Sequence, residues 1–299
     1  VLFRSVAYEK ALTLAPDIPY LRGNLLLYRL HCCDWRHYRQ DCDAVSGSLE
    51  AGKSAILPFP FTTVSRSAEE QLRCARLWAG REYPKAPALW RGERYRHDKI
   101  RLAYVSADFH AHATAHLMAG VFEHHDRSRF EINAISLGPD DSGELRTRLL
   151  TSIDRFIDVR RNGDAEAAAI VRQLETDIAI DLKGYTLNHR AGIFAHRPAP
   201  IQASYLGYPG TMGADFIDYL IADRIVAPEE HQPHYTEKLA YLPDSYQCND
   251  AKRRISERTP SRAEAGLPET GFVFCCFNNN YKIAPDIFDI WMRLLDRKS

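Results

Sequence analysis

The segment 108–116 gathers side chains suited to acid–base or metal chemistry, because it holds Asp108 and histidines at positions 110, 112 and 116. Asp108 and His112 could pair, with the carboxylate orienting the imidazole as a base. The histidines at 112 and 116 could bind a metal from one helix face, but Ala113 replaces the glutamate of an H-E-x-x-H motif. Taken alone, the segment fits ordinary polar loop and core histidines best.

Two glycine-bearing segments could contact an anionic or sugar ligand. The segment 184–190 ends in Arg190, whose planar guanidinium can meet a phosphate or carboxylate, although a solvated arginine at a helix start explains it equally well. The segment 206–213 reads Leu-Gly-Tyr-Pro-Gly-Thr-Met-Gly, and its glycines would let backbone approach a sugar or phosphate. A tight turn that needs positive φ is the alternative.

A lysine near the end of the chain could stabilise negative charge. Lys282 lies in the segment 277–283 (Phe-Asn-Asn-Asn-Tyr-Lys-Ile), just before an expected helix start. A cation and a helix terminus at one place suit a departing diphosphate. The alternative is a surface lysine, which is the common fate of lysines.

Alternating apolar runs and amphipathic stretches between 97 and 246 predict the elements that position these segments. The pattern is typical of an α/β domain with a largely parallel sheet, in which ligands bind at the carboxyl ends of strands. Strands are expected at 100–106, 130–136, 156–159, 177–182, 201–206, 219–222 and 239–242, and helices at 113–125, 143–150 and 164–175.

The flanking regions predict a helical start and an incomplete second α/β unit. Helices are expected at 6–15 and 19–31, and the run 8–16 resembles the second half of a tetratricopeptide repeat, with an unrelated helical hairpin as the alternative. The predicted units are 1–45 (end of the repeats), 46–96 (connector, extended at 57–64 and helical at 68–80), 97–246 (first lobe), 247–270 (linker) and 271–299 (start of a truncated second lobe, with a strand at 272–277 and a helix at 285–295).

The composition is that of an ordinary globular protein. The 299 residues carry 39 basic and 39 acidic side chains, so no global field draws the chain to nucleic acid or to an anionic membrane. No run reaches the roughly 18 apolar residues that span a bilayer. Seven cysteines, an odd number without a C-x-x-C spacing, predict free thiols in the cytoplasm. Both ends, 1–5 and 296–299, have the character of translated adapter sequence, so we expect the natural protein to continue in both directions.

The order of the segments is more specific than any one of them. The stretch 104–118 (Tyr-Val-Ser-Ala-Asp-Phe-His-Ala-His-Ala-Thr-Ala-His-Leu-Met) resembles the first catalytic motif of the O-GlcNAc transferase family, glycosyltransferase family 41. The runs 197–203 (Arg-Pro-Ala-Pro-Ile-Gln-Ala) and 206–213 are similar to the family's most distinctive sequence. The segments 237–243 and 277–283 also match. The resemblance implies two Rossmann-like lobes of the GT-B type, with the site in the cleft between them.

The resemblance also implies roles for individual residues. His112 would lie over the donor sugar, where a role as base has been proposed, with Asp108 supporting it, and Lys282 would neutralise the leaving diphosphate. The implied donor-binding residues are Thr114, Arg190, Leu206, Gly207, Pro209, Asn279 and Tyr281. Asn279 stands where the family often has a glutamine, which leaves the nucleobase open. The resemblance implies neither a metal nor a cofactor, only a nucleotide-sugar co-substrate.

The activity that the resemblance implies is transfer of N-acetylglucosamine from UDP-GlcNAc to Ser or Thr hydroxyls of acceptor proteins, with inversion. Because the second lobe is incomplete, we expect this chain alone to be inactive. Three alternatives remain open: a related transferase with another donor such as GDP-fucose, a non-catalytic binding module linked to tetratricopeptide repeats, and a metal-dependent hydrolase.

Overall fold

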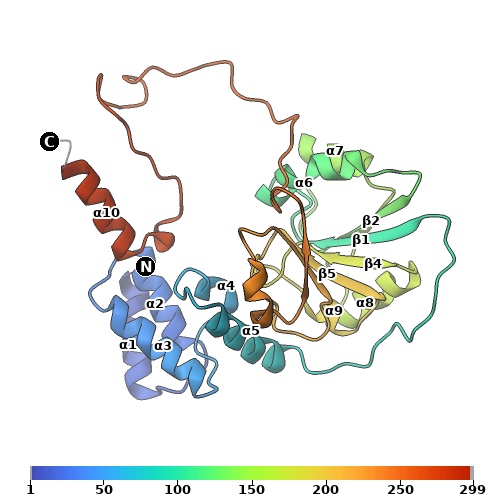
Figure 1. The fold of residues 1–299 in the computed structure, drawn as a ribbon, viewed down its shortest axis with the longest axis horizontal. Coiled ribbons are helices and arrows are strands. Elements are labelled where there is room, and N and C mark those ends of the chain that lie inside the picture. Colours follow the sequence, from blue (N-terminus) through green and yellow to red (C-terminus); the bar gives the residue numbers. More distant parts are fainter. Residues whose placement is uncertain (1, 297–299) are drawn as a thin grey trace.

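A computed structural model describes residues 2–296, which form a helical segment, a sheet domain and a tail (Figure 1). The helical segment contains α1 (Leu2–Leu14), α2 (Leu21–His31), α3 (Tyr38–Glu50), α4 (Pro58–Phe61) and α5 (Ala68–Glu82). Its core includes Leu26, Leu30, Val45, Leu49 and Phe61. The helices predicted at 6–15, 19–31 and 68–80 are confirmed, whereas their assignment to a tetratricopeptide repeat stays a prediction.

Two features of the helical segment differ from the sequence prediction. The helix α3 was not predicted, because the run Ser46-Gly47-Ser48 lowers its helical propensity. Its apolar side chains Val45 and Leu49 are nevertheless buried, so packing stabilises it. The connector predicted to be extended at 57–64 instead contains the short helix α4, because Pro58 suits the first helical position, where no N–H is needed.

Seven parallel strands form one sheet in the order β3-β2-β1-β4-β5-β6-β7. They are β1 (Ile100–Ser106), β2 (Phe130–Ser136), β3 (Arg155–Asp158), β4 (Ile178–Asp181), β5 (Ile201–Tyr205), β6 (Tyr219–Ala222) and β7 (Lys238–Tyr241). The predicted parallel α/β domain is therefore confirmed, with strand limits within a residue or two of those expected.

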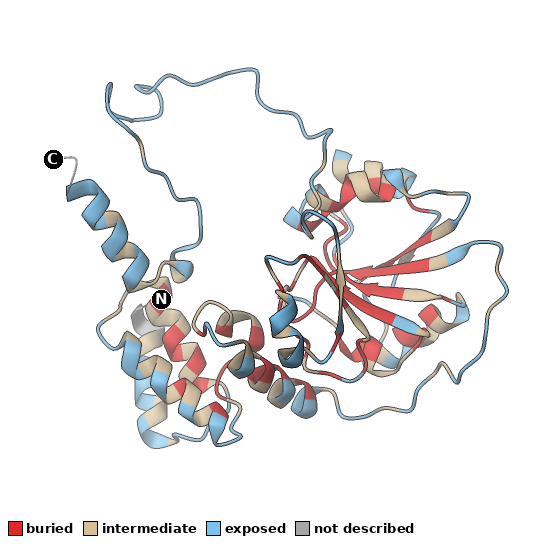
Figure 2. Cartoon of the chain, viewed as in Figure 1, coloured by how far each residue is buried: buried red, intermediate tan, exposed pale blue. Residues whose placement is uncertain are grey.

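Both faces of the sheet are buried, as the red strands in Figure 2 show. Along β1, Leu102 and Tyr104 belong to one core and Ala103 and Val105 to the other, which follows from the two-residue repeat of a strand. The first core also takes Met118 and other residues of α6 (Ala113–His124) and α7 (Glu144–Thr151). The second takes residues of α5, α8 (Asp164–Gln173) and α9 (Gly192–Ala195).

The strand order places a topological switch point between β1 and β4. From β1 the chain builds outward through β2 and β3, and from β4 it builds in the other direction through β5, β6 and β7. Connections at such a point diverge to opposite sides, which opens a crevice at the carboxyl ends of the two strands. The segments that follow Ser106 and Asp181 therefore face each other across the expected ligand site.

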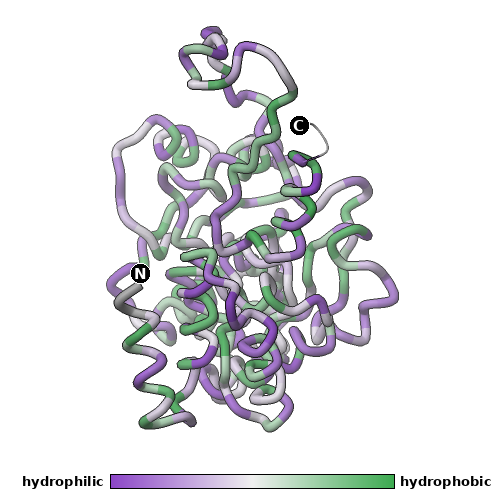
Figure 3. The backbone as a smooth tube through the Cα atoms, turned by 90° about the vertical axis from the view of Figure 1, so that its left-hand side faces the viewer, coloured by the Kyte–Doolittle hydropathy of each residue, from purple (hydrophilic) through white to green (hydrophobic). Residues whose placement is uncertain are grey.

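After η1 (Glu229–His234) and β7 the chain still packs on the sheet domain through Tyr246 and Cys248, and Asp250 pairs with Arg148. From Ala251 it runs as an exposed tail to η2 (Asn280–Lys282) and α10 (Pro285–Asp296) (Figure 1). The strand predicted at 272–277 is wrong: these residues have no strand structure, and Phe277 is 96% exposed. A strand needs a partner for its hydrogen bonds, and residues 2–296 supply none here. The turned view shows apolar (green) stretches lying among polar (purple) ones along the backbone (Figure 3).

The start of the predicted second lobe lies against the helical segment. The Tyr281 ring lies 4.9 Å from the His31 ring, and the Trp35 and Phe288 rings are 5.2 Å apart. In Figure 1, α10 (dark red) accordingly lies beside the blue helices, away from the sheet. None of the helices within residues 2–296 is both long and apolar enough to cross a bilayer.

Candidate active site

A buried ion pair joins the two sides of the crevice at the switch point. Asp108 follows β1, Lys183 follows β4, and Lys183 Nζ lies 2.6 Å from Asp108 Oδ2. Both side chains are only 6% exposed. Lysine is among the side chains least often buried, and one that is buried needs a partner. The buried ion pair therefore makes this crevice a candidate functional site.

Sequence reasoning found Asp108 but missed Lys183. Nothing local links the two residues, because their partnership exists only once β1 and β4 are neighbours. One signal was present: a lysine directly follows the run from Ala179 to Leu182, which is buried, at the carboxyl end of a strand. A charged residue at that place is a candidate site residue in a parallel sheet.

Thr114 and His112 complete the cluster around Asp108. Thr114 Oγ1 donates to Asp108 Oδ2 at 3.2 Å, and His112 Nδ1 lies 3.4 Å from the same oxygen. His112 also caps α6, since its Nδ1 accepts the backbone N–H of Thr114 at 3.2 Å. The structure thus brings together three of the predicted site residues.

The protonation of His112 follows from these contacts. Burial lowers the pKa of His112, opposed by the Asp108 carboxylate and aided by the Lys183 ammonium. The imidazole is therefore neutral at pH 7, and the cap to Thr114 needs the Nδ1 lone pair, which puts the proton on Nε2. In this tautomer His112 Nε2 offers a hydrogen-bond donor to a ligand, and the role as base that the resemblance implies remains a prediction.

The loop 206–213 reaches the same crevice from β5. A Cβ added at Gly207 would lie 2.1 Å from the carbonyl oxygen of Leu182, so only glycine lets the loop pass the end of β4. Leu206, directly before it, has φ of 67° and is buried. The predicted donor residues Leu206, Gly207 and Pro209 therefore lie next to the segment that carries Lys183.

The far half of this loop is held by a carboxylate that the sequence did not reveal. Glu237 accepts from Thr211 Oγ1 at 2.7 Å and from the backbone N–H of Met212 at 2.6 Å. Tyr185 donates its hydroxyl to the Met212 carbonyl at 2.7 Å. Burial raises the pKa of Glu237, and its hydrogen bonds from Thr211 and Met212 oppose this. The loop is fixed in shape before any ligand arrives.

Arg190 is bonded to other residues than Asp108, His112 and Thr114. Its guanidinium donates to Asp164 Oδ1 at 2.7 Å, to the Val159 carbonyl at 3.0 Å and to the Asn162 carbonyl at 2.7 Å. These bonds occupy all three of its nitrogens and connect it to the loop between β3 and α8. The role in donor binding that the resemblance implies for Arg190 remains a prediction.

The remaining predicted residues also lie away from the crevice. Asn279, Tyr281 and Lys282 are at η2, which contacts α2. The structure thus does not bring Lys282 to Asp108 and His112, and its role remains a prediction. Within residues 2–296, no cluster of three His, Cys, Asp or Glu side chains could hold a metal ion.

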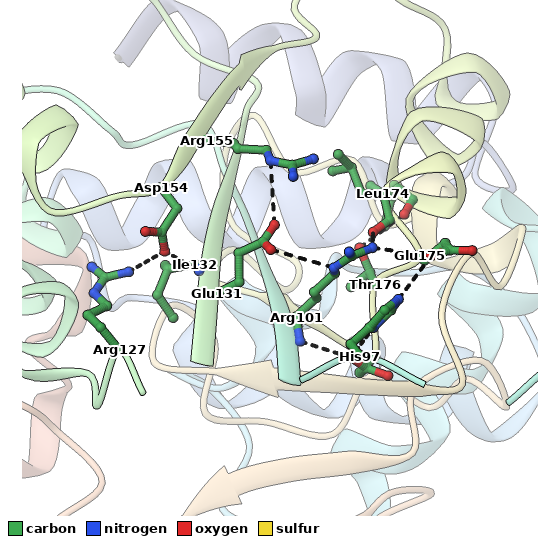
Figure 4. Close-up of polar contacts among 12 residues, drawn as sticks. His97, Arg101, Arg127, Glu131, Ile132, Asp154, Arg155, Leu174, Glu175 and Thr176 are labelled. Carbon is green, nitrogen blue, oxygen red and sulfur yellow. Dashed lines mark hydrogen bonds and ion pairs between the residues drawn. The ribbon is translucent and has the colours of Figure 1, made fainter. Parts of the chain in front are cut away.

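A second charged network lies at the amino-terminal ends of the strands, opposite the crevice (Figure 4). His97 lies 2.9 Å from Glu175, and Arg101 at the start of β1 connects Glu175 with Glu131. Arg155 at the start of β3 also approaches Glu131, at 3.5 Å. Because ligands of parallel sheets bind at the carboxyl ends of strands, this network lies away from the expected ligand site.

The fold is that of a sugar-transferring enzyme class, as comparison with known proteins shows. The chain belongs to glycosyl transferase family 41, whose model matches residues 83–259 and 252–299. A probable UDP-N-acetylglucosamine–peptide N-acetylglucosaminyltransferase, SEC, of Arabidopsis thaliana is 41% identical over 204 residues, which are 67% of this chain and 21% of the relative. The Caenorhabditis elegans UDP-N-acetylglucosamine–peptide N-acetylglucosaminyltransferase is 40% identical over 164 residues, 54% of this chain and 14% of the relative.

A solved structure agrees with these sequence matches. A Thermobaculum terrenum O-GlcNAc transferase mutant superposes with a TM-score of 0.73 at 26% identity, covering 97% of this chain and 55% of that one. The predicted family and the GT-B type lobe are therefore confirmed. The chain matches 21% of the length of the first of these curated relatives and 14% of the second.

Proposed function

We propose that this chain is the sugar-facing part of an inverting transferase that moves N-acetylglucosamine from UDP-GlcNAc to Ser or Thr hydroxyls of proteins. The observation that carries the proposal is the meeting of Asp108, Thr114 and Lys183 with the loop 206–213 at the switch point. The names of the relatives supply the donor and the peptide acceptor. The seven free cysteines support the cytoplasm as its location.

The chemistry needs a bond between the acceptor oxygen and the anomeric carbon to form while the bond from that carbon to the diphosphate breaks. The hydroxyl proton must leave, and the charge that grows on the diphosphate must be stabilised. In our proposal His112 donates to the bound sugar through Nε2–H, and Thr114 and the Gly207 backbone shape the sugar pocket. The Asp108 carboxylate would take up the proton, directly or through water.

Lys282 would supply the charge for the departing diphosphate once a complete second lobe carries it to the cleft. Removing a preorganised charge aimed at a leaving group costs about 100- to 1000-fold in rate. We therefore expect Lys282→Ala in the full-length protein to lower kcat by that factor while circular dichroism and melting stay unchanged. Wild-type rates from this variant would end the assignment of Lys282.

The experiment that tests the function is transfer of labelled sugar by the full-length protein that contains this chain. We expect incorporation into protein from UDP-GlcNAc and not from GDP-fucose, and we expect Asp108→Asn to slow this incorporation strongly while leaving a measurable rate. Incorporation from GDP-fucose alone would show that the donor is not UDP-GlcNAc, while the protein would still be a glycosyltransferase. No incorporation from either donor would refute the transferase proposal.

A second candidate function is a binding module without catalysis. The observation that favours it is the docking of η2 on α2, where Tyr281 contacts His31 and Lys282 lies away from the crevice. A module of this kind would retain protein partners after Asp108→Asn and Lys282→Ala. Dependence of its cellular effect on either residue would exclude it.

A further inference from the structure

We infer that Lys183 is a positioning residue of the proposed transferase, which holds the Asp108 carboxylate and sets the hydrogen-bonding polarity of the crevice wall. The inference rests on the proposed function for its kinetic test. It also makes a claim about the buried pair that can be measured in this chain without any turnover.

The position of Lys183 is fixed by its backbone, independently of its side chain. Its N–H donates to Asp181 Oδ1 at 2.8 Å. The next residue, Gly184, has φ of 52°, and a Cβ there would lie 2.3 Å from the Tyr208 side chain. This turn aims the side chain across the crevice from β4 toward the segment after β1. An apolar side chain would fill the same space without the cost of burying an ammonium, so packing alone does not explain a lysine here.

The contacts of Asp108 show what the lysine does. Lys183, Thr114 and His112 all approach the same oxygen, Oδ2, at 2.6, 3.2 and 3.4 Å. Within residues 2–296, Oδ1 takes no hydrogen bond, so it is the oxygen left for a ligand. As the acceptor of the ion pair with Lys183, the Asp108 carboxylate offers a ligand only hydrogen-bond acceptors.

Thr114 takes its polarity from the same arrangement. Its hydroxyl donates to Asp108, so its oxygen can only accept from a ligand. The wall built by Asp108 and Thr114 is therefore an array of acceptors. It fits ligand groups that donate, such as sugar hydroxyls, an amide N–H or the hydroxyl of an incoming acceptor. Without Lys183, Asp108 Oδ2 would keep only its contacts with Thr114 and His112, so neither its position nor the direction of the Thr114 hydroxyl would be fixed by an ion pair.

The kinetic test is a double-mutant cycle in the full-length protein with Lys183→Met, Asp108→Asn and the pair of changes. We expect Lys183→Met to lower kcat about 100-fold, the size of effect that misplaced catalytic groups produce. In the Asp108→Asn background the same change should cost less than threefold, because Lys183 acts through Asp108. Lys252→Met is the matched control, since Lys252 pairs with Glu123 at 2.9 Å on the surface and should keep wild-type rates. Equal losses from Lys183→Met in both backgrounds would overturn the inference.

Thermal unfolding of this chain tests the pair separately. Lys183→Met leaves a buried carboxylate unpaired and should lower the melting midpoint by about 10 °C. The double variant, with neither charge, should recover at least half of that loss, and it stays informative if Lys183→Met alone does not fold. Additive losses would show that the two side chains are not a unit and would overturn the inference. If the wild-type protein transfers no sugar, the proposed function fails, while this unfolding cycle still decides whether the pair holds.

Discussion

Asp181 stands at the end of β4 with its carboxyl group fully enclosed. Its Oδ1 accepts the Lys183 N–H at 2.8 Å, whereas Oδ2 is buried and finds no partner within residues 2–296. Burial raises the pKa of Asp181 from 3.8 to about 6, against the opposing hydrogen bonds from the backbone of Lys183 and Gly184. A carboxyl group whose pKa is raised on folding stabilises the fold below its unfolded pKa, and this contribution is lost as the pH rises through the folded value.

The magnitude follows from the shift. A difference between 3.8 and about 6 corresponds to about 3 kcal/mol, of which about 2.5 kcal/mol develops between pH 4 and pH 8. Asp181→Asn cannot ionise, so it removes this dependence and no other. Wild type should lose about 2.5 kcal/mol of stability from pH 4 to pH 8 that Asp181→Asn does not lose. The free energy of unfolding of the variant minus that of wild type should therefore increase by about 2.5 kcal/mol over this range.

Urea unfolding at 25 °C, followed by circular dichroism at several pH values, gives the required difference. Any fixed cost of placing an amide at the site cancels, because only the change of the difference with pH is compared. Glu257→Gln, on the exposed linker, is a control whose difference from wild type should stay flat. If the difference for Asp181→Asn stays flat or falls as the pH rises, the conclusion that burial raises the pKa of Asp181 is refuted.

Three other changes test the loops around the crevice. Gly207→Ala puts a Cβ 2.1 Å from the Leu182 carbonyl and should cost about 2–3 kcal/mol in thermal unfolding, whereas Gly80→Ala in open space within α5 should stabilise by up to about 1 kcal/mol. Glu237→Gln should speed amide exchange of the Met212 N–H at least about tenfold, since a charged acceptor becomes a neutral amide; unchanged protection would show that Glu237 does not hold the loop. Arg190→Met should lower stability by about 2–3 kcal/mol, and a loss of donor affinity at unchanged stability would instead support the role implied by resemblance.

The sequence predicted the sheet well because β1, β2 and β5 are short segments in which apolar and aromatic residues recur, and such segments can be recognised without knowing their neighbours. It failed where an element depends on what packs against it. The helix α3 forms because Val45 and Leu49 are covered, and the expected strand at 272–277 does not form because nothing pairs with it. The amphipathic pattern at 285–295 did predict α10, since a helix completes its own hydrogen bonds.

The same distinction explains the candidate site. Asp108, Thr114 and Gly207 stood out through motif and resemblance, and the structure brings them to one crevice. Lys183 and Glu237 did not stand out, because their partners are distant in sequence and a single sequence does not report pairings. Charged residues directly beside buried strands were the available signal.

The central place of β1 has a consequence for how the protein is made. Its neighbours are β2, reached after 23 residues, and β4, whose partner Ile178 lies 76 positions beyond Leu102. A ribosome adding about 5–20 residues per second exposes one edge of β1 for several seconds before β4 emerges. During that interval the edge is open to pairing with other chains, so nascent chains should need chaperone protection. The crevice forms only when β4 pairs with β1, late in folding.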